Sequence, residues 1–105
     1  RENSKSLVGE TACSYIDRFN ADIAFMSCRG FSIERGVSEA SEEEAAVKRR
    51  YLANCKKSIL LCDLSKMNVD FLCKLAALSD YYEVITERKE TNDLCNQYTQ
   101  LHRPN

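Results

Sequence analysis

The chain has 105 residues, of which 44% are hydrophobic and 30% charged, a composition typical of one globular domain rather than of a disordered segment. Fifteen basic and sixteen acidic residues leave a net charge of −1, which argues against direct DNA contact through a broad basic face. No apolar run is long enough to span a bilayer and no secretory leader opens the chain, so we predict a cytoplasmic protein without a membrane partner.

Two apolar patterns occupy the first part of the chain. Apolar residues recur at helical spacing over Ser6–Phe19, which predicts an amphipathic helix with one buried stripe. Ile23–Met26 is a continuous apolar run of strand length, and we expect a strand there. The next segment, 29–40, contains Gly30 and Gly36 and is expected to form a long loop.

A capping box begins the second predicted helix. In Ser41–Glu44 the Ser hydroxyl and the Glu side chain can satisfy each other's unpaired backbone donors. We expect this helix to extend through Lys56–Lys57, with Glu44 and Lys48 as an i,i+4 ion pair and Lys48–Arg50 on a solvated face. Its apolar stripe is predicted to contain Val47, Tyr51, Leu52 and Cys55.

The stretch Ser58–Lys66 carries the strongest signal of a site. Ile59–Cys62 is apolar without interruption, which indicates a short strand buried on both faces, as in a parallel sheet. Asp63, Ser65 and Lys66 follow at its carboxyl end. Open α/β sheets bind their ligands at that end of their strands, so we expect a site there.

Three further segments complete the predicted order of elements. Phe71–Leu78 fits either a short helix or a broken strand with a turn, whereas Tyr82–Thr86 is predicted as a third strand. The last helix is expected over about Asn92–Leu101, with Pro104 helping to end it and with one face formed by Leu94, Tyr98 and Leu101. Strands that alternate with helices predict an α/β fold, a mostly parallel sheet covered on both faces in three layers.

The cysteines are predicted to be reduced and structural. They mostly lie at apolar positions of the predicted elements, where a free thiol behaves as a small buried hydrophobe. No two of them form a CxxC motif and the single His102 lies beside the C-terminus, so we expect no metal site and no cofactor. A disulfide framework is the alternative interpretation of six cysteines: Cys13, Cys28, Cys55, Cys62, Cys73 and Cys95.

Five pieces of the chain form a recognisable series: Gly9, Asp22–Phe25 leading to Gly30, Glu43–Lys48, Leu60–Lys66 and Val84–Thr86. In order and spacing they resemble the effector-binding domain of the DeoR family of bacterial transcriptional regulators. The Asp-x-Ser-Lys sequence after an apolar strand is the most specific of them. The resemblance covers about residues 5–100, and Phe25–Gly30 is most similar to the fucose-operon activator branch.

This resemblance implies a sensor domain with the fold shared by ribose-5-phosphate isomerase and glucosamine-6-phosphate deaminase, which binds phosphorylated sugars. Complete family members begin with a winged helix-turn-helix, followed by the first sensor strands and a phosphate-cradling loop. The present chain opens on Arg1 without these parts. We therefore expect residues 1–105 to be one domain, the C-terminal portion of the sensor. Operator DNA is then an expected partner only through the absent N-terminal domain, and the complete protein is expected to be a homo-oligomer.

The expected effector site consists of Asp63, Lys66, Ser65, Gly30 and Glu44, with no catalytic residue among them. The Lys66 ammonium can neutralise part of a phosphate, and Asp63 can accept hydrogen bonds from sugar hydroxyls. The alternative is a solvated Asp63–Lys66 ion pair in a turn. Ser65 can donate to a ligand or cap the turn, Gly30 can admit a ligand or serve a turn, and Glu44 can face the pocket or cap its helix.

Two classes of function remain open. The favoured class is a non-enzymatic sensor, in which the effector changes the affinity of the complete regulator for operator DNA. The alternative is a sugar-phosphate isomerase or deaminase of the same fold, with Asp63 or Glu44 as base and Lys66 as electrostatic stabiliser. Arg29 departs from the family, which often has Asp at this position, and this changes the charge of the pocket. Because part of a sensor leaves sheet edge and apolar surface uncovered, we also expect self-association or low stability.

Overall fold

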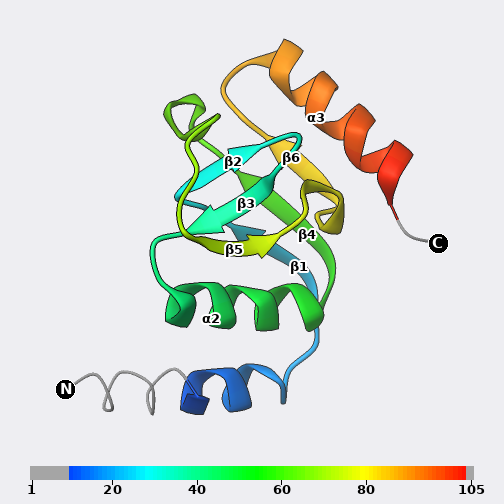
Figure 1. Cartoon of the computed structure of the whole chain (residues 1–105). Coiled ribbons are helices and arrows are strands. Elements are labelled where there is room, and N and C mark those ends of the chain that lie inside the picture. Colours follow the sequence, from blue (N-terminus) through cyan, green and yellow to red (C-terminus); the bar gives the residue numbers. More distant parts are fainter. Residues whose placement is uncertain (1–9, 104–105) are drawn as a thin grey trace.

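The structure, a computed structural model, describes residues 10–103, which form two small sheets and three helices (Figure 1). Four residues used in the sequence predictions lie outside this range: Arg1, Ser6 at the start of the predicted first helix, Gly9 and Pro104. Within it, no helix is long and apolar enough to cross a membrane. The elements in chain order are the helical residues 10–16, β1 (Ala21–Met26), β2 (Gly30–Ser32), β3 (Gly36–Glu39), α2 (Glu42–Ala53), β4 (Cys55–Leu61), the 3-10 turn η1 (Leu64–Lys66), β5 (Cys73–Ala76), the 3-10 turn η2 (Leu78–Asp80), β6 (Glu83–Ile85) and α3 (Lys89–His102).

A parallel sheet with strand order β1-β4-β6 confirms the predicted α/β class. β4 is the central strand: Leu60 lies opposite Met26 of β1 on one side and opposite Val84 of β6 on the other. Ser58–Leu60 are buried, whereas Leu61 faces solvent. The predicted burial on both faces is therefore limited to part of the strand, because one face of the sheet is only partly covered.

The boundary between α2 and β4 lies earlier than predicted. The backbone N–H of Asn54 donates to the Arg50 and Tyr51 carbonyls, and its side-chain amide also donates to the Arg50 carbonyl, so the helix ends at Ala53. β4 then begins at once, and Lys56–Lys57 belong to this strand rather than to the helix. The ordering of charges that suits the helix dipole therefore ends with Arg50, the basic residue in the last turn.

A second, antiparallel sheet has the order β2-β3-β5. The predicted loop over 29–40 is wrong, because this segment folds into the β2–β3 hairpin, in which Phe31 lies opposite Val37. Gly36 starts β3 with a φ of +83°, a left-handed conformation that glycine adopts without steric cost. The ambiguous segment 71–78 adopts the alternative of a strand and a turn, because β5 pairs with β3 and η2 follows it.

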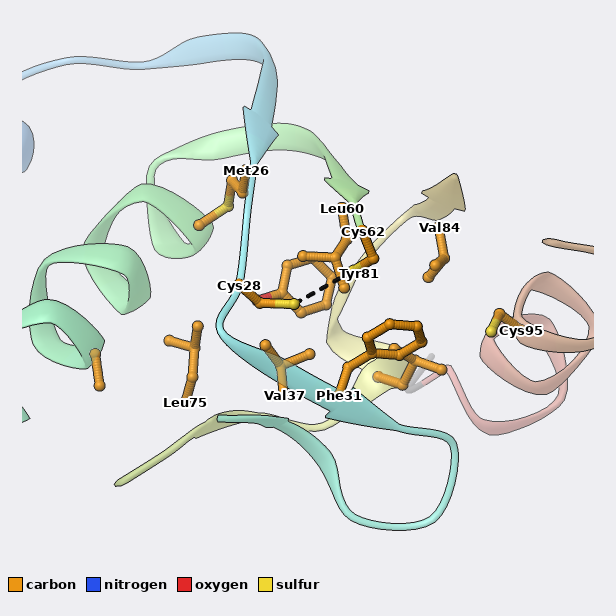
Figure 2. Packing of buried hydrophobic residues seen from close by; sticks show 12 residues of the cluster. Met26, Cys28, Phe31, Val37, Leu60, Cys62, Leu75, Tyr81, Val84 and Cys95 are labelled. Atoms are coloured by element: carbon orange, nitrogen blue, oxygen red, sulfur yellow. Dashed lines mark hydrogen bonds between the residues drawn. The ribbon is translucent and has the colours of Figure 1, made fainter. Parts of the chain in front are cut away.

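The hydrophobic core lies between the two sheets and against both long helices (Figure 2). Tyr81, which follows η2, is the largest fully buried side chain. The other core residues that are at most 1% exposed are Phe31, Val37, Ala45, Leu60, Leu78, Val84 and Cys95. The predicted stripe of α2 is therefore wrong in part: Ala45 is its buried residue, while Tyr51 is largely exposed and Cys55 belongs to β4.

The first helix is confirmed over residues 10–16 and ends before the predicted Phe19. Tyr15 and Phe19 stack on each other with ring centroids 5.9 Å apart, yet both are more than half exposed. The expected burial of these two residues is therefore wrong. They line an apolar groove between this helix and α2.

The last helix runs longer than predicted and turns a different face to the core. Thr91, Cys95 and Thr99 are its buried residues, whereas Leu94 and Leu101 are 57% and 74% exposed. The reason is that two side-chain amides of α3 form hydrogen bonds with the backbone at the outer edge of β6. Asn96 donates to the Val84 carbonyl at 3.0 Å and accepts from the Val84 N–H at 2.7 Å. Asn92 makes the same pair of bonds to Thr86 at 3.2 and 2.6 Å, which fixes the rotation of the helix.

The β1 edge of the parallel sheet, which is opposite the β6 edge, and one face of this sheet carry exposed apolar side chains. β1 pairs with β4 alone among the described strands. Ile23 and Phe25 of β1 are 52% and 68% exposed, and Leu61 of β4 and Ile85 of β6 are also exposed. Parallel sheets normally have both faces covered, and an exposed apolar edge strand is a template for pairing. We call these four residues the open face.

We expect the 105-residue chain to self-associate through the open face. Phe25→Asp places a charge on the most exposed of these four side chains and should shift the chain toward monomer. Sedimentation velocity at several concentrations measures the change. Leu72→Asp is the matched control, because Leu72 is even more exposed but lies in the loop before β5. A well-folded monomer at all concentrations would contradict this prediction.

Candidate functional site

Three chain segments meet at the carboxyl edge of the parallel sheet. Ser27–Gly30 follow β1, Cys62–Lys66 follow β4 and begin η1, and Thr86–Glu87 follow β6. The backbone N–H of Leu64 donates to the Glu87 carboxylate at 2.8 Å, which joins the second segment to the third. The residues that the sequence placed after the central strand therefore lie beside residues from both neighbouring strands.

The turn η1 positions three of the predicted site residues. The Asp63 carboxylate accepts a hydrogen bond from the Ser65 N–H at 3.4 Å, and this bond is the main reason why the pKa of Asp63 is lowered. Lys66 ends the turn and is half-buried. None of the ion pairs formed within residues 10–103 involves Lys66. The solvated Asp63–Lys66 pair is thus not formed, and this ammonium group remains available.

Gly30 holds the η1 segment against the hairpin. It is buried at the start of β2, and a Cβ atom at this position would collide with the Val69 carbonyl oxygen. Next to it, the Phe31 carbonyl accepts a hydrogen bond from the Asn68 N–H at 2.7 Å. Gly30 therefore permits the close approach of the chain that follows η1. Its part in the predicted effector site stays a prediction.

Glu44 lies near the carboxyl edge through its contact with Arg29. Its backbone N–H donates to the Ser41 hydroxyl at 3.2 Å, which is one half of the predicted capping box. Its carboxylate lies 3.8 Å from the Arg29 guanidinium, and both side chains are about half exposed. The predicted Glu44–Lys48 ion pair is wrong, because these two residues have different partners.

The ion pair between Lys48 and Glu39 was missed by sequence reasoning. Lys48 Nζ lies 2.7 Å from Glu39 Oε2 and donates to the Ser27 carbonyl at 3.1 Å. The Glu39 side chain is only 1% exposed and also accepts from the Arg29 N–H at 3.2 Å, while its Oε1 is buried and has no hydrogen-bond partner among residues 10–103. Lys48 is three residues beyond the buried Ala45 on α2, and this spacing was the available signal that Lys48 faces the core.

The other two basic residues of the predicted solvated face also have partners. Arg49 donates to the Leu75 carbonyl of β5 at 3.1 Å and pairs with Glu42 at 2.7 Å. Arg50 pairs with Asp17 at 3.2 Å. The Arg49–Glu42 and Arg50–Asp17 pairs lie at the surface, whereas the Lys48–Glu39 and Arg49–Leu75 hydrogen bonds are partly buried. The expectation of a uniformly solvated basic face is therefore wrong.

Two buried thiols also meet at the carboxyl edge. Cys28 Sγ and Cys62 Sγ lie 3.3 Å apart (Figure 2). All six cysteines are free, as predicted. The hydrogen bond from Cys62, with the nearby Lys48 and Lys66 charges, lowers the pKa of Cys28. The hydrogen bond with Cys28, together with burial, raises the pKa of Cys62. Among residues 10–103, no group of three or more His, Cys, Asp or Glu side chains is arranged to hold a metal ion.

The family model described as the DeoR C terminal sensor domain matches residues 1–88. The HTH-type transcriptional regulator GlpR of Haloferax volcanii is 32% identical over 87 residues, which are 83% of this chain and 34% of GlpR. The HTH-type transcriptional regulator GolR of Listeria innocua is 28% identical over 102 residues, 97% of this chain and 40% of GolR. The putative aga operon transcriptional repressor of Escherichia coli O157:H7 is 32% identical over 75 residues, 71% of this chain and 28% of the repressor. The chain spans about a third of the length of these curated relatives.

Proposed function

We propose, from the premise that this chain belongs to the DeoR C-terminal sensor domain family, that it binds a phosphorylated sugar at the carboxyl edge of its parallel sheet. Membership of the family supports the general role of an effector-sensing, regulatory domain. The proposal adds a phosphorylated ligand and the residues that contact it, and the charges and positions of the side chains at this edge support both.

The observation that carries the proposal is the half-buried Lys66 ammonium. It has no ion-pair partner within the described part of the chain, and it lies at the strand end where open α/β sheets bind ligands. Arg29, which pairs with Glu44 only at 3.8 Å, supplies a second cation on the neighbouring segment. A phosphate group between these cations would receive charge-assisted hydrogen bonds, while the exposed Asp63 carboxylate would accept from sugar hydroxyls.

The proposal extends to the complete regulator. This chain would be the C-terminal portion of the sensor, and an N-terminal helix-turn-helix would contact operator DNA. Effector binding would shift the equilibrium between two states of a homo-oligomer that differ in affinity for the operator. The names of GlpR and GolR as HTH-type regulators support this arrangement, as does the open face of β1, which would be covered in a larger assembly.

An isomerase or deaminase activity has less support. The three relatives are named as regulators of transcription. A general base works best with a pKa near the working pH, whereas the hydrogen bond from Ser65 lowers the pKa of Asp63 below that of an ordinary carboxyl group. Asp63 is therefore better suited to accept hydrogen bonds than to remove a proton from carbon.

Lys66→Ala is expected to weaken sugar-phosphate binding by roughly 10- to 100-fold, the equivalent of one charge-assisted hydrogen bond. Isothermal titration of a complete regulator that contains this chain, against a panel of triose, pentose and hexose phosphates, measures the loss. Lys56→Ala is the matched control, because Lys56 lies near the amino end of β4, away from the proposed site. The unphosphorylated sugars should bind far more weakly than their phosphates. Equal affinity of Lys66→Ala and the wild type, or turnover of the bound sugar phosphate observed by NMR, would contradict the proposal.

A further inference from the structure

Cys28 and Cys62 lie in the segments that directly follow the neighbouring strands β1 and β4, at the carboxyl edge of the sheet. In the parallel register Met26 lies opposite Leu60, and each cysteine follows its strand partner by two residues. The two sulfur atoms are 3.3 Å apart across 34 residues of chain, and both side chains are buried (Figure 2). The pairing of β1 with β4 therefore brings the two segments that carry the cysteines side by side.

This arrangement fits the geometry of a disulfide. Neighbouring strands are about 4.8 Å apart, which falls within the Cα separations of roughly 4.4 to 6.8 Å that disulfides span. The sulfur atoms lie 3.3 Å apart and would have to approach to about 2.0 Å. Rotation of the two side chains can supply this movement while the hydrogen bonds between β1 and β4 remain in place.

The surroundings of the two thiols differentiate their roles. The hydrogen bond with Cys62, helped by the smaller effects of the Lys48 and Lys66 charges, favours a thiolate at Cys28 and lowers its pKa, although burial and Glu39 oppose this. Cys62 lacks such help, and its pKa is raised. Cys28 is therefore suited to attack an oxidant, and Cys62 to react with the product.

We propose that Cys28 and Cys62 are a site of reversible disulfide formation by hydrogen peroxide. The Cys28 thiolate attacks one peroxide oxygen, the O–O bond breaks, and sulfenic acid and hydroxide form, the latter taking a proton to become water. The Cys62 sulfur then attacks the sulfenic sulfur, the S–O bond breaks, and the leaving hydroxide takes the Cys62 proton to become a second water. The two thiols are oxidised by two electrons and one peroxide is reduced to two waters. A dithiol such as dithiothreitol reverses the reaction by exchange.

The disulfide ties the segment that carries Arg29 to the segment that carries Asp63 and Lys66. It therefore restrains the two sides of the carboxyl edge, whichever ligand binds there. Closing a loop of 34 residues should also stabilise the fold, with an expected rise in the melting temperature of roughly 5–15 °C. This inference does not depend on the proposed sugar-phosphate ligand.

The test is oxidation of the reduced, folded 105-residue chain with one equivalent of hydrogen peroxide, followed by non-reducing peptide mass spectrometry. A Cys28–Cys62 peptide, lighter by two hydrogens than its reduced parts, should be the dominant cross-link. The melting temperature should rise and return to its first value after dithiothreitol. Cys28→Ser and Cys62→Ser should abolish both effects, whereas Cys13→Ala, a change of a half-buried thiol on the first helix, should preserve them.

Oxidation in 6 M guanidinium is the second arm, because an unfolded chain pairs its thiols without regard to the sheet. A mixture of cross-links is expected there. The proposal is overturned if circular dichroism shows the chain to be folded and the two thiols remain alkylatable after peroxide, or if the folded chain gives the same mixture as the unfolded one. If the amides of residues 27–31 and 62–69 exchange no more slowly after cross-linking, the inference that the disulfide restrains the carboxyl edge is overturned.

Discussion

Lys48→Met is expected to destabilise the fold by about 3–5 kcal/mol, because it leaves a buried carboxylate without its counter-charge. The Glu39 side chain is only 1% exposed, and Lys48 provides the sole ion pair that it makes within residues 10–103. After the change, the Arg29 N–H would be its one remaining donor. Urea unfolding followed by circular dichroism measures the free energy of unfolding of both proteins.

The double variant Lys48→Met/Glu39→Leu separates loss of the pair from loss of packing. It removes both charges, and replacement of a buried pair by apolar residues is often neutral or stabilising, so most of the lost stability should return. Arg50→Met is the control for a surface pair, since Arg50 and its partner Asp17 are both about half exposed, and it should cost at most about 1 kcal/mol. A Lys48→Met variant as stable as Arg50→Met would show that Glu39 is solvated or neutral in the folded chain.

The parallel sheet could be predicted because its signals are local. Ile59–Cys62 is apolar without a break, and Ser41 is followed by the acids that begin a helix, so β4 and α2 could be recognised without knowledge of their partners. The alternation of strands and helices then gave the parallel arrangement. The end of α2 was missed because Lys56 and Lys57 fit the polarity of either element, and the caps formed by Asn54 decide between them.

The second sheet could not be predicted because its strands are short and polar. β2 and β3 contain three and four residues, and Ser38 and Glu39 in β3 look like loop residues. Their burial depends on β5, which joins the sheet from a segment that is distant in sequence. The orientation of α3 has a similar origin, since Asn92 and Asn96 bond the β6 edge and turn the more apolar Leu94 toward solvent. A hydrophobic pattern alone does not contain this information.

The predicted site residues and the missed ion pair differ in how far apart in the sequence the cooperating residues lie. Asp63 and Lys66 are close in sequence and follow a recognisable strand, so the turn that presents them could be located. Glu39 and Lys48 are meaningful only together, and Glu39 lies in the hairpin that was mistaken for a loop. The effector-binding role of all five predicted residues stays a prediction, for which titration of Lys66→Ala is the direct test.

Gly30→Ala is expected to destabilise the fold by about 3 kcal/mol and to displace the segment that carries Lys66. The added methyl group would collide with the Val69 backbone, which cannot yield as a flexible side chain does. The Phe31–Asn68 hydrogen bond beside it should then weaken, and amides over 63–69 should exchange faster. Urea unfolding and hydrogen exchange on the folded variant measure the two effects.

Gly36→Ala is the matched control for this change. Gly36 has a positive φ, and an added Cβ there would collide with the Ala76 carbonyl oxygen, so the variant should lose a similar amount of stability. The collision lies beside β5 rather than η1, so exchange over 63–69 should change only as much as global stability does. Both variants are compared at a temperature where both are folded. If Gly30→Ala alone raises hydrogen exchange over 63–69 and weakens sugar-phosphate binding, Gly30 positions the candidate site. Equal effects of the two substitutions would mean that Gly30 serves only the packing of the hairpin.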